Sequence, residues 1–167
     1  MKILETRRLL LRHSMLNDLE DLKTLYADPG VGLALASGDS TPKESLRAML
    51  MAHTEEFRRE GIGLLSVVNP ELGQVVGQCG LRRQTIDGNT SLVLQCAINA
   101  SARRDGLGAE ACAAVIHYAS EELPSESMIA LVDEKNVGAL KLATKLGLVR
   151  TGEVDRGGRT LAIFTPS

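Results

Sequence analysis

The chain has 167 residues and a formal net charge of −2, with 44% apolar and 24% charged residues. This length suits one domain with a single core of ordinary size, and the near-neutral charge argues against a generic binder of nucleic acids. Only 2% of the residues are aromatic and none is tryptophan, so the core must be aliphatic and stacking platforms for bases are not expected.

The first elements predicted along the chain are a strand and a helix. Residues 3–12 form an apolar run with interleaved charges, which favours a strand. Asn17 can cap the helix that follows, Glu20 can close a capping box, and Pro29 stops the pattern. The predicted apolar face of this helix consists of Leu19, Leu22, Leu25 and Tyr26.

A second helix is predicted after a glycine-rich loop. Thr41 can cap it, Pro42 suits its first turn, Glu44 follows three positions after the cap, and Gly61 ends it. Its apolar stripe consists of Leu46, Met49, Leu50, His53 and Phe57. Because His53 falls on this stripe, we interpret it as a packed histidine rather than a catalytic one.

Strands follow, and then helices and strands alternate. Residues 64–68 and 74–81 predict a hairpin, and residues 90–99 a third antiparallel strand after a turn. We predict a helix over 107–122 and a buried strand over 127–132.

The last predicted elements are a helix and a hairpin. Asn136 can cap the helix and Gly147 can close it, and the hairpin turns around residues 155–158. No repeat or linker interrupts the pattern, so the sequence predicts one mixed α+β domain.

The stretch Arg103-x-x-Gly106-x-Gly108 carries the main functional signal. A glycine turn that leads into a helix leaves backbone N–H groups free, and the helix dipole favours an anion there. Arg103 and Arg104 add positive charge. A Walker loop fails because no Lys-Ser or Lys-Thr pair follows, and the dinucleotide fingerprint lacks its third glycine. On spacing alone, a turn without a ligand is an equally good interpretation.

The three cysteines, Cys79, Cys96 and Cys112, show no metal-ligand spacing and cannot all pair. This favours reduced thiols in a cytoplasmic protein, and we predict no metal site. We interpret each as a small buried hydrophobic residue. No signal peptide or membrane-length apolar run appears in the sequence, so we expect no membrane partner.

Several motifs resemble the GNAT superfamily of N-acetyltransferases. Arg-x-x-Gly-x-Gly, about five residues after a strand end, is similar to its acyl-coenzyme-A pyrophosphate loop. "LETRRLLLR…NDLEDL", "GQVVGQCGL" and "NVGALKLATKLGLVRTGE" resemble the branch of RimJ and RimL, the ribosomal-protein acetyltransferases. The resemblance implies one GNAT-like domain over residues 1–167, with a central mixed, mostly antiparallel twisted sheet flanked by helices.

The same resemblance implies a splayed strand pair that holds acetyl-CoA. The strand that ends near Ile98 would part from the strand 127–132, and the pantetheine arm would lie in the gap against the backbone of Cys96 and Ile98. Asn136 is either a cofactor contact or a plain helix cap, and the two loop arginines either meet phosphate or are solvated. The predicted cofactor-binding residues are Cys96, Ala97, Ile98, Arg103, Arg104, Asp105, Gly106, Leu107, Gly108, Ala109 and Asn136.

The usual catalytic groups of the superfamily are missing. The resemblance implies a strand carboxylate and a tyrosine on the last helix, but Val93 and Leu94 stand at the first position and Ala143 at the second. Cys96 could become acylated or be a buried thiol. Glu153 could face the acceptor or be a surface carboxylate.

The neutral fractions of amines at pH 7 favour a weakly basic acceptor. At pH 7 an α-amine with a pKa near 8 is roughly a tenth neutral, whereas a lysine side chain is neutral in about one molecule in 2,500. This difference of roughly 3 kcal/mol falls on the barrier when no base is supplied.

The leading hypothesis is therefore an acetyl-CoA-dependent N-acetyltransferase that acts directly on a protein N-terminal α-amine or a small-molecule amine, which Gln95 could orient. The alternative is a relative that binds acyl-CoA with weak or no catalysis, as a sensor or interaction domain. The sequence leaves a homodimer open.

Overall fold

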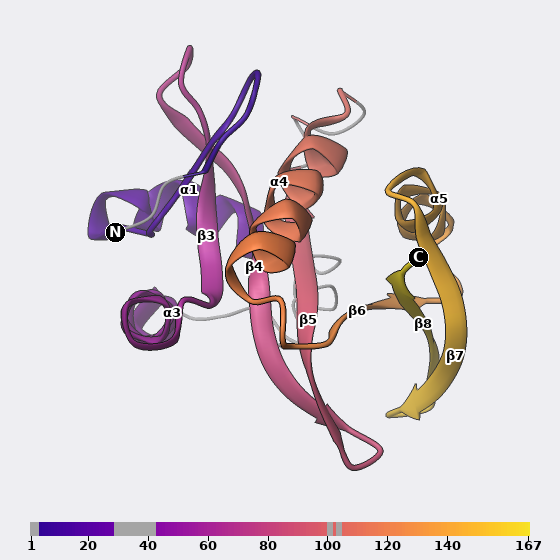
Figure 1. Cartoon of the computed structure of the whole chain (residues 1–167). Helices are drawn as coiled ribbons and strands as arrows, with labels where there is room; N and C mark the ends of the chain where they lie inside the picture. Colours follow the sequence, from indigo (N-terminus) through magenta and orange to yellow (C-terminus); the bar gives the residue numbers. More distant parts are fainter. Residues whose placement is uncertain (1–3, 29–42, 100–101, 103–104) are drawn as a thin grey trace.

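The computed structural model of the chain describes residues 4–28, 43–99, 102 and 105–167 (Figure 1). An eight-stranded sheet runs in the order β1-β2-β3-β4-β5-β6-β8-β7. Its strands are β1 (Leu4–Glu5), β2 (Leu10–Arg12), β3 (Gly63–Asn69), β4 (Gln74–Ile86), β5 (Asn89–Ile98), β6 (Met128–Asp133), β7 (Leu148–Arg156) and β8 (Arg159–Pro166). The helices in these ranges are the 3-10 turn η1 (Leu16–Asp18), α1 (Leu19–Tyr26), α3 (Lys43–Glu60), α4 (Leu107–Glu122) and α5 (Val137–Lys145).

The pairing confirms the predicted mixed, mostly antiparallel α+β fold. Among the paired strands, β5 and β6 run parallel and the other neighbours run antiparallel. The β4–β5 hairpin turns at Asp87 and Gly88, which both have a positive φ, as a two-residue turn of this kind requires. β4 extends five residues past its predicted end at Leu81 because it continues to pair with β5 up to that turn.

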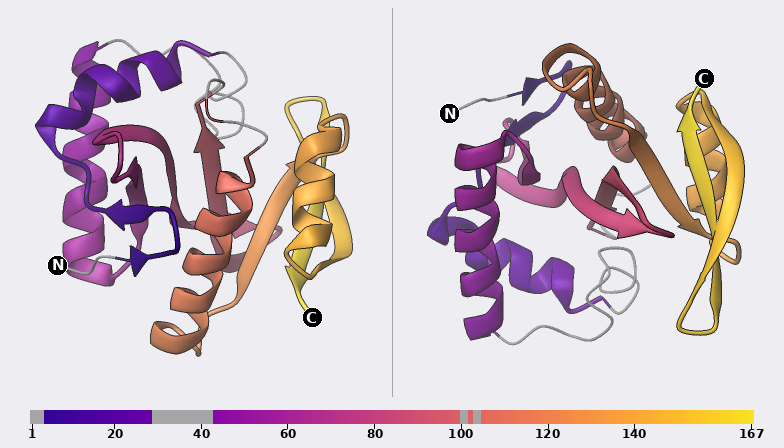
Figure 2. Two further views of the ribbon diagram at one scale, coloured as in Figure 1. Left: turned by 90° about the horizontal axis from the view of Figure 1, so that it is seen from above. Right: turned by 60° about the horizontal axis from the view of Figure 1, so that its bottom comes forward.

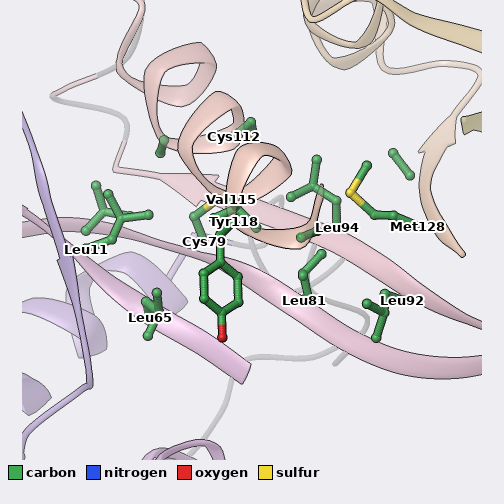
Figure 3. Packing of buried hydrophobic residues seen from close by; sticks show 14 of the residues in the cluster. Leu11, Leu65, Cys79, Leu81, Leu92, Leu94, Cys112, Val115, Tyr118 and Met128 are labelled. Carbon is green, nitrogen blue, oxygen red and sulfur yellow. The ribbon is translucent and has the colours of Figure 1, made fainter. Parts of the chain in front are cut away.

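Helices cover both faces of the sheet. Figure 2 shows α1 and α4 on opposite sides of the central strands. The predicted face of α1 packs with Leu46, Met49 and Leu50 of α3 against β3, β4 and β5. Phe57 of the same stripe belongs to the larger core instead. On the other side, α4 and α5 pack on a larger core that includes Leu81, Leu94, Val115 and Met128 (Figure 3). The predicted starting residues Thr41 and Pro42 of α3 lie outside the described residues, and Gly61 ends that helix with a φ of 75°.

The predicted first strand is in fact two short strands. β1 and β2 pair with each other around a turn in which the Thr6 N–H donates to the Leu9 carbonyl at 2.9 Å. The Leu9 N–H in turn donates to the Thr6 hydroxyl at 2.9 Å. The Thr6 hydroxyl thereby takes the place of a backbone acceptor and allows the chain to turn between β1 and β2. The apolar pattern of residues 3–12 does not reveal this turn.

The cap predicted at Asn17 is also wrong. Asn17 lies inside η1, and the Asp18 carboxylate instead closes the start of η1 by accepting from the Met15 N–H at 2.8 Å. The same carboxylate pairs with Arg12 at 2.8 Å and accepts from the Ser66 hydroxyl at 3.0 Å. Asp18 is 4% exposed, so this one side chain joins η1 to β2 and β3 through satisfied polar contacts. Hydrogen bonds from Arg12, Met15 and Ser66 outweigh its burial and lower the pKa of Asp18.

None of the helices in the described ranges is both long enough and apolar enough to cross a lipid bilayer.

Candidate functional site

Strands β5 and β6 form a splayed pair, as expected. They pair only from Leu92 to Leu94, opposite residues 128–130. β5 then continues along β4 to Ile98, while β6 continues along β8 to Asp133. Figure 1 shows the two strands diverging, with β6, β8 and β7 turning away from the rest of the sheet.

The backbone of β5 faces this gap at alternate residues. Asn99 donates to the Val76 carbonyl at 2.7 Å, and Leu92 donates to the Ser127 carbonyl at 2.7 Å. Odd-numbered residues of β5 therefore hydrogen-bond toward β4, and even-numbered residues direct their N–H and C=O groups toward β6. Beyond Leu94 these even-numbered residues are Cys96 and Ile98. Their backbone groups face the gap, and the buried Ala97 faces α1 and α3.

A cavity of about 770 Å³ occupies the gap. Its walls include the β5 segment 93–96 and the β6 segment 130–133, and α5 contributes Ala143. Cys112 of α4 also lines it. The lining is mostly apolar with a few polar groups, which is the usual make-up of a small-molecule site.

The glycine turn lies at the start of α4. Gly106 has a φ of 77°, and the Glu110 N–H donates to the Gly106 carbonyl at 3.1 Å. The N–H groups of Leu107, Gly108 and Ala109 therefore precede the hydrogen-bond ladder of α4 and lie at the positive end of its dipole.

Gly108 connects this turn with the end of the splayed strand. A Cβ at Gly108 would lie 3.7 Å from Ile98 Cγ1 and 3.8 Å from Leu142 Cδ2. Leu142 lines the cavity, so the first turn of α4 borders the same region. Asp105 is exposed, and Arg103 and Arg104 lie outside the described residues.

Sequence reasoning missed a cluster that holds this turn in place. The Arg8 backbone N–H and its Nε each donate to the Glu110 carboxylate at 2.8 Å, and Arg8 Nη1 donates to the Asp105 carbonyl at 2.8 Å. The Thr6 hydroxyl donates to the same carboxylate. Burial opposes ionisation of Glu110, but these hydrogen bonds outweigh it and lower its pKa. Arg8 and Glu110 are far apart in sequence, so no local pattern could have paired them.

Asn136 acts as the predicted helix cap. Its Oδ1 accepts from the Ala139 N–H at 3.1 Å. Asn136 also lines the cavity, so the cap residue borders the gap.

Gln95 is the notable polar group of the cavity wall. It is 7% exposed, and its Oε1 has no hydrogen-bond partner in the described part of the chain. A buried acceptor without a partner is uncommon in folded proteins. Its side chain lies on the α1 side of the sheet because it neighbours Ala97 at a spacing of two.

The expected proton-transfer positions stay apolar in the structure. Val93, Leu94 and Ala143 all line the cavity. Asp133 also lines it, but its carboxylate accepts from the Lys135 N–H at 2.9 Å and lies 3.7 Å from Arg159. Among the described residues that line the cavity, Asp133 is the one carboxylate.

The two catalytic candidates, Cys96 and Glu153, lie in different surroundings. Cys96 is half-buried and lines the cavity. Glu153 is exposed on β7 and pairs with Arg150 at 3.1 Å, and it is not among the lining residues. His53 is buried against the sheet, which confirms its interpretation as a packed histidine.

Comparisons with known proteins agree with this geometry. Residues 8–149 match the family described as "Acetyltransferase (GNAT) domain". The uncharacterized protein YkkB of Bacillus subtilis (strain 168) is 24% identical over 140 residues, which cover 84% of this chain and 80% of that protein.

Two solved structures illustrate the likeness in fold. An acetyltransferase from Agrobacterium tumefaciens str. C58 has a TM-score of 0.82 and 20% identity, with 100% of this chain and 95% of that chain covered. RimL, a ribosomal L7/L12 alpha-N-protein acetyltransferase, has a TM-score of 0.77 and 13% identity, with 98% and 96% covered. That RimL structure contains coenzyme A in a disulfide with one of the enzyme's cysteines. At these identities the likeness shows a shared fold.

Proposed function

The chain belongs to the GNAT acetyltransferase family, and we propose that it transfers the acetyl group of acetyl-CoA directly to an α-amine or another weakly basic amine. The observation that carries this proposal is the cavity between β5 and β6. It is bordered by the β5 backbone at Cys96 and by the start of α4, while its lining offers no unpaired carboxylate among the described residues.

The residues at the start of α4 suit a diphosphate. The N–H groups of Leu107, Gly108 and Ala109 are free of the helix ladder, and Gly108 has no side chain to block approach. Glu110 would repel an anion at this position, but Arg8 pairs with it at 2.8 Å and offsets its charge. We assign the diphosphate of acetyl-CoA to these amides.

The pantetheine arm would extend from that turn along β5. Cys96 directs its backbone N–H and C=O groups into the gap, where an extended arm with amide groups can use them as partners. Asn136, on the opposite wall, is a further contact for the arm. This arrangement brings the thioester toward residues 93–95, where the amine must approach from the α1 side.

The amine must be neutral to attack the thioester carbonyl. Attack forms the new C–N bond and a tetrahedral oxyanion. Collapse of this intermediate breaks the C–S bond, and the departing coenzyme A thiolate takes up the proton that the nitrogen loses. Gln95 Oε1 can accept a hydrogen bond from the amine N–H and orient it, but it cannot remove a proton. Because the described lining supplies no free base, the acceptor itself must be partly neutral at working pH.

A protein N-terminus fits this requirement best. Its α-amine is neutral far more often than a lysine side chain at pH 7. The fold likeness to RimL, which is described as an alpha-N-protein acetyltransferase, supports the same class of acceptor. The RimJ/RimL-like branch is therefore our proposal for the place of this chain within the family.

The second candidate function is an acyl-CoA sensor with weak or no catalysis. The apolar side chains of Val93, Leu94 and Ala143 in the cavity wall favour it, since none can move a proton.

Paired peptides of one sequence separate these functions. One peptide keeps a free α-amine and an acetylated lysine, and the other has an acetylated N-terminus and a free lysine. Release of coenzyme A is measured at pH 7 under saturating acetyl-CoA. We expect the free α-amine to react roughly 200-fold faster, following the ratio of neutral amines. Faster reaction of the lysine peptide would overturn the proposal, and saturable binding without turnover on any amine would favour the sensor.

A further inference from the structure

The three cysteines meet in space although they are scattered in the sequence. Cys79 of β4, Cys96 of β5 and Cys112 of α4 bring their sulfur atoms within 4.8 Å of one another. Figure 3 shows Cys79 and Cys112 in the core between the sheet and α4. Cys96 and Cys112 both line the cavity, but Cys112 is only 2% exposed and Cys96 is half-buried. Cys79 is 0% exposed and is not among the lining residues. Cys96 is thus the most exposed residue of the cluster, and Cys79 lies behind it.

The strand register makes Cys79 and Cys96 a matched pair. They are directly opposite each other in the antiparallel β4–β5 ladder. The Asn99 N–H bond to Val76 fixes the hydrogen-bonded positions of this ladder, and three residues further along, Cys79 and Cys96 form a non-hydrogen-bonded pair. Cα atoms in such a pair are about 4.5 Å apart, which lies within the range that a disulfide can span.

The cluster also differentiates its three thiols. Hydrogen bonds from Cys112 and Cys79 lower the pKa of Cys96, although burial opposes them. The same contacts with Cys112 and Cys96, together with burial, raise the pKa of Cys79. The thiolate, which is the reactive form, therefore concentrates on Cys96, the most exposed residue of the cluster.

We propose that Cys96 is an oxidation site for hydrogen peroxide entering through the cavity, and that Cys79 is its resolving thiol. The Cys96 thiolate attacks one peroxide oxygen and breaks the O–O bond, giving a sulfenic acid and hydroxide. The Cys79 thiol then attacks the Cys96 sulfur, which forms the disulfide and releases water. Peroxide is reduced, and the two thiols together supply the two electrons.

The resolving step protects the cavity wall. A sulfenic acid left on Cys96 can be oxidised further to a sulfinic acid, which is not reversed by ordinary thiols. That would place an anionic group between the walls of the gap. The disulfide instead draws the Cys96 sulfur toward β4 and leaves the cavity wall uncharged. Unlike the sulfinic acid, it can be reduced again by thiols.

The test uses the full chain, fully reduced and then treated with hydrogen peroxide. Free thiols are counted and cross-linked peptides are mapped by mass spectrometry under non-reducing conditions. We expect two of the three thiols to be lost and a Cys79–Cys96 disulfide to form. The matched variant Cys112→Ala should form the same disulfide. Cys79→Ala should instead accumulate a Cys96 sulfenic acid that dimedone traps, and Cys96→Ala should lose thiols at least tenfold more slowly.

Each variant is first checked for the wild-type circular dichroism spectrum, and the wild-type protein alone already gives the decisive peptide map. A disulfide that involves Cys112, a disulfide between chains, or retention of all three thiols would overturn the proposal.

Adding coenzyme A tests the thiol site and the proposed cofactor site separately. The expectation that coenzyme A protects Cys96 rests on the proposed function. We expect saturating coenzyme A to slow the oxidation of Cys96 several-fold, because the bound arm would cover it. If the Cys79–Cys96 disulfide forms at the same rate with and without coenzyme A, the thiol site stands and the placement of the cofactor is wrong.

Discussion

Leu94 and Ala130 are the last residues at which β5 and β6 face each other as a pair. Past this point β5 stays paired with β4, and β6 stays paired with β8. Each strand therefore stays hydrogen-bonded to one neighbour where the gap opens, and this pairing holds its backbone in place. The walls are preorganised for an extended ligand arm, which lowers the entropic cost of binding.

Alanine at Gly108 should separate cofactor binding from folding. The added Cβ would meet Ile98 and Leu142 at 3.7 and 3.8 Å, which is ordinary contact, and alanine favours a helix over glycine by about 1 kcal/mol. We expect Gly108→Ala to keep or raise the unfolding midpoint while raising the KM for acetyl-CoA about tenfold, because the methyl group narrows the approach to the amides. An unchanged KM would show that the diphosphate binds elsewhere.

Alanine at Gly106, unlike alanine at Gly108, should clearly lower the stability of the fold. Its φ of 77° is a left-handed conformation, and the nearest atom to an added Cβ is Arg8 Nη2 at an acceptable 3.5 Å. The cost of Gly106→Ala is thus conformational, about 1 kcal/mol or slightly more. Urea denaturation measures it. Gly106→Asn should lose less, since asparagine tolerates this region better, and equal losses would argue against this explanation.

The Arg8–Glu110 pair should matter more for binding than for stability. Its arginine side chain is 44% exposed, so breaking the pair costs little in folding. Arg8→Ala leaves the Glu110 carboxylate unneutralised beside the proposed diphosphate, and we expect acetyl-CoA affinity to fall several-fold. The double variant Arg8→Ala with Glu110→Gln should recover most of this loss. Calorimetric titration of acetyl-CoA into the wild type, the two single variants and the double variant gives a double-mutant cycle. Additive losses of affinity would contradict the electrostatic account.

The elements that sequence predicts correctly are those whose signals are local. The capped helix after Asn136, the end of α3 at Gly61 and the turn after Ile86 each depend on residues within a few positions of one another. The errors at Thr6 and Asp18 share one cause. In both places a side chain bonds the backbone or reaches another strand, and such contacts override a pattern read along the chain.

The candidate site divides in the same way. The glycine turn before α4 was recognisable because its residues are consecutive. By contrast, Arg8 reaches Glu110 across the fold, and the three cysteine sulfurs converge from separate elements. Neither arrangement leaves a recognisable spacing in the sequence, because strand register and helix packing bring these residues together.

Gln95 should be a positioning residue for the acceptor. Its Oε1 is buried without a partner among the described residues, which costs stability of about 1 kcal/mol or more. Gln95→Leu removes this unpaired group, so we expect equal or higher stability together with a several-fold higher KM for the amine and an unchanged KM for acetyl-CoA. A loss of stability would indicate a structural role instead, and an unchanged amine KM would remove Gln95 from the acceptor site.

The stability of the fold should depend on pH through His53. This residue is 2% exposed, and neither ring nitrogen has a hydrogen-bond partner in the described residues. Burial, with a smaller contribution from the charge of Arg82, lowers the pKa of His53 to about 4. Because the folded pKa lies below the unfolded value near 6.5, the unfolded chain binds more protons between pH 6.5 and 4. Stability is therefore greatest above pH 6.5 and falls through this window, by about 3 kcal/mol in total.

His53→Met removes the titrating ring and keeps an apolar side chain of similar size. Urea denaturation from pH 7 to pH 4 should then show a flatter loss of stability. A residual slope should remain in the variant because burial also lowers the pKa of His13. His117→Gln, on the exposed face of α4, serves as the control and should keep the wild-type slope. If His53→Met keeps the full loss between pH 6.5 and 4, another group is responsible, and the buried ring of His53 must be protonated in the folded state at a pH well above 4.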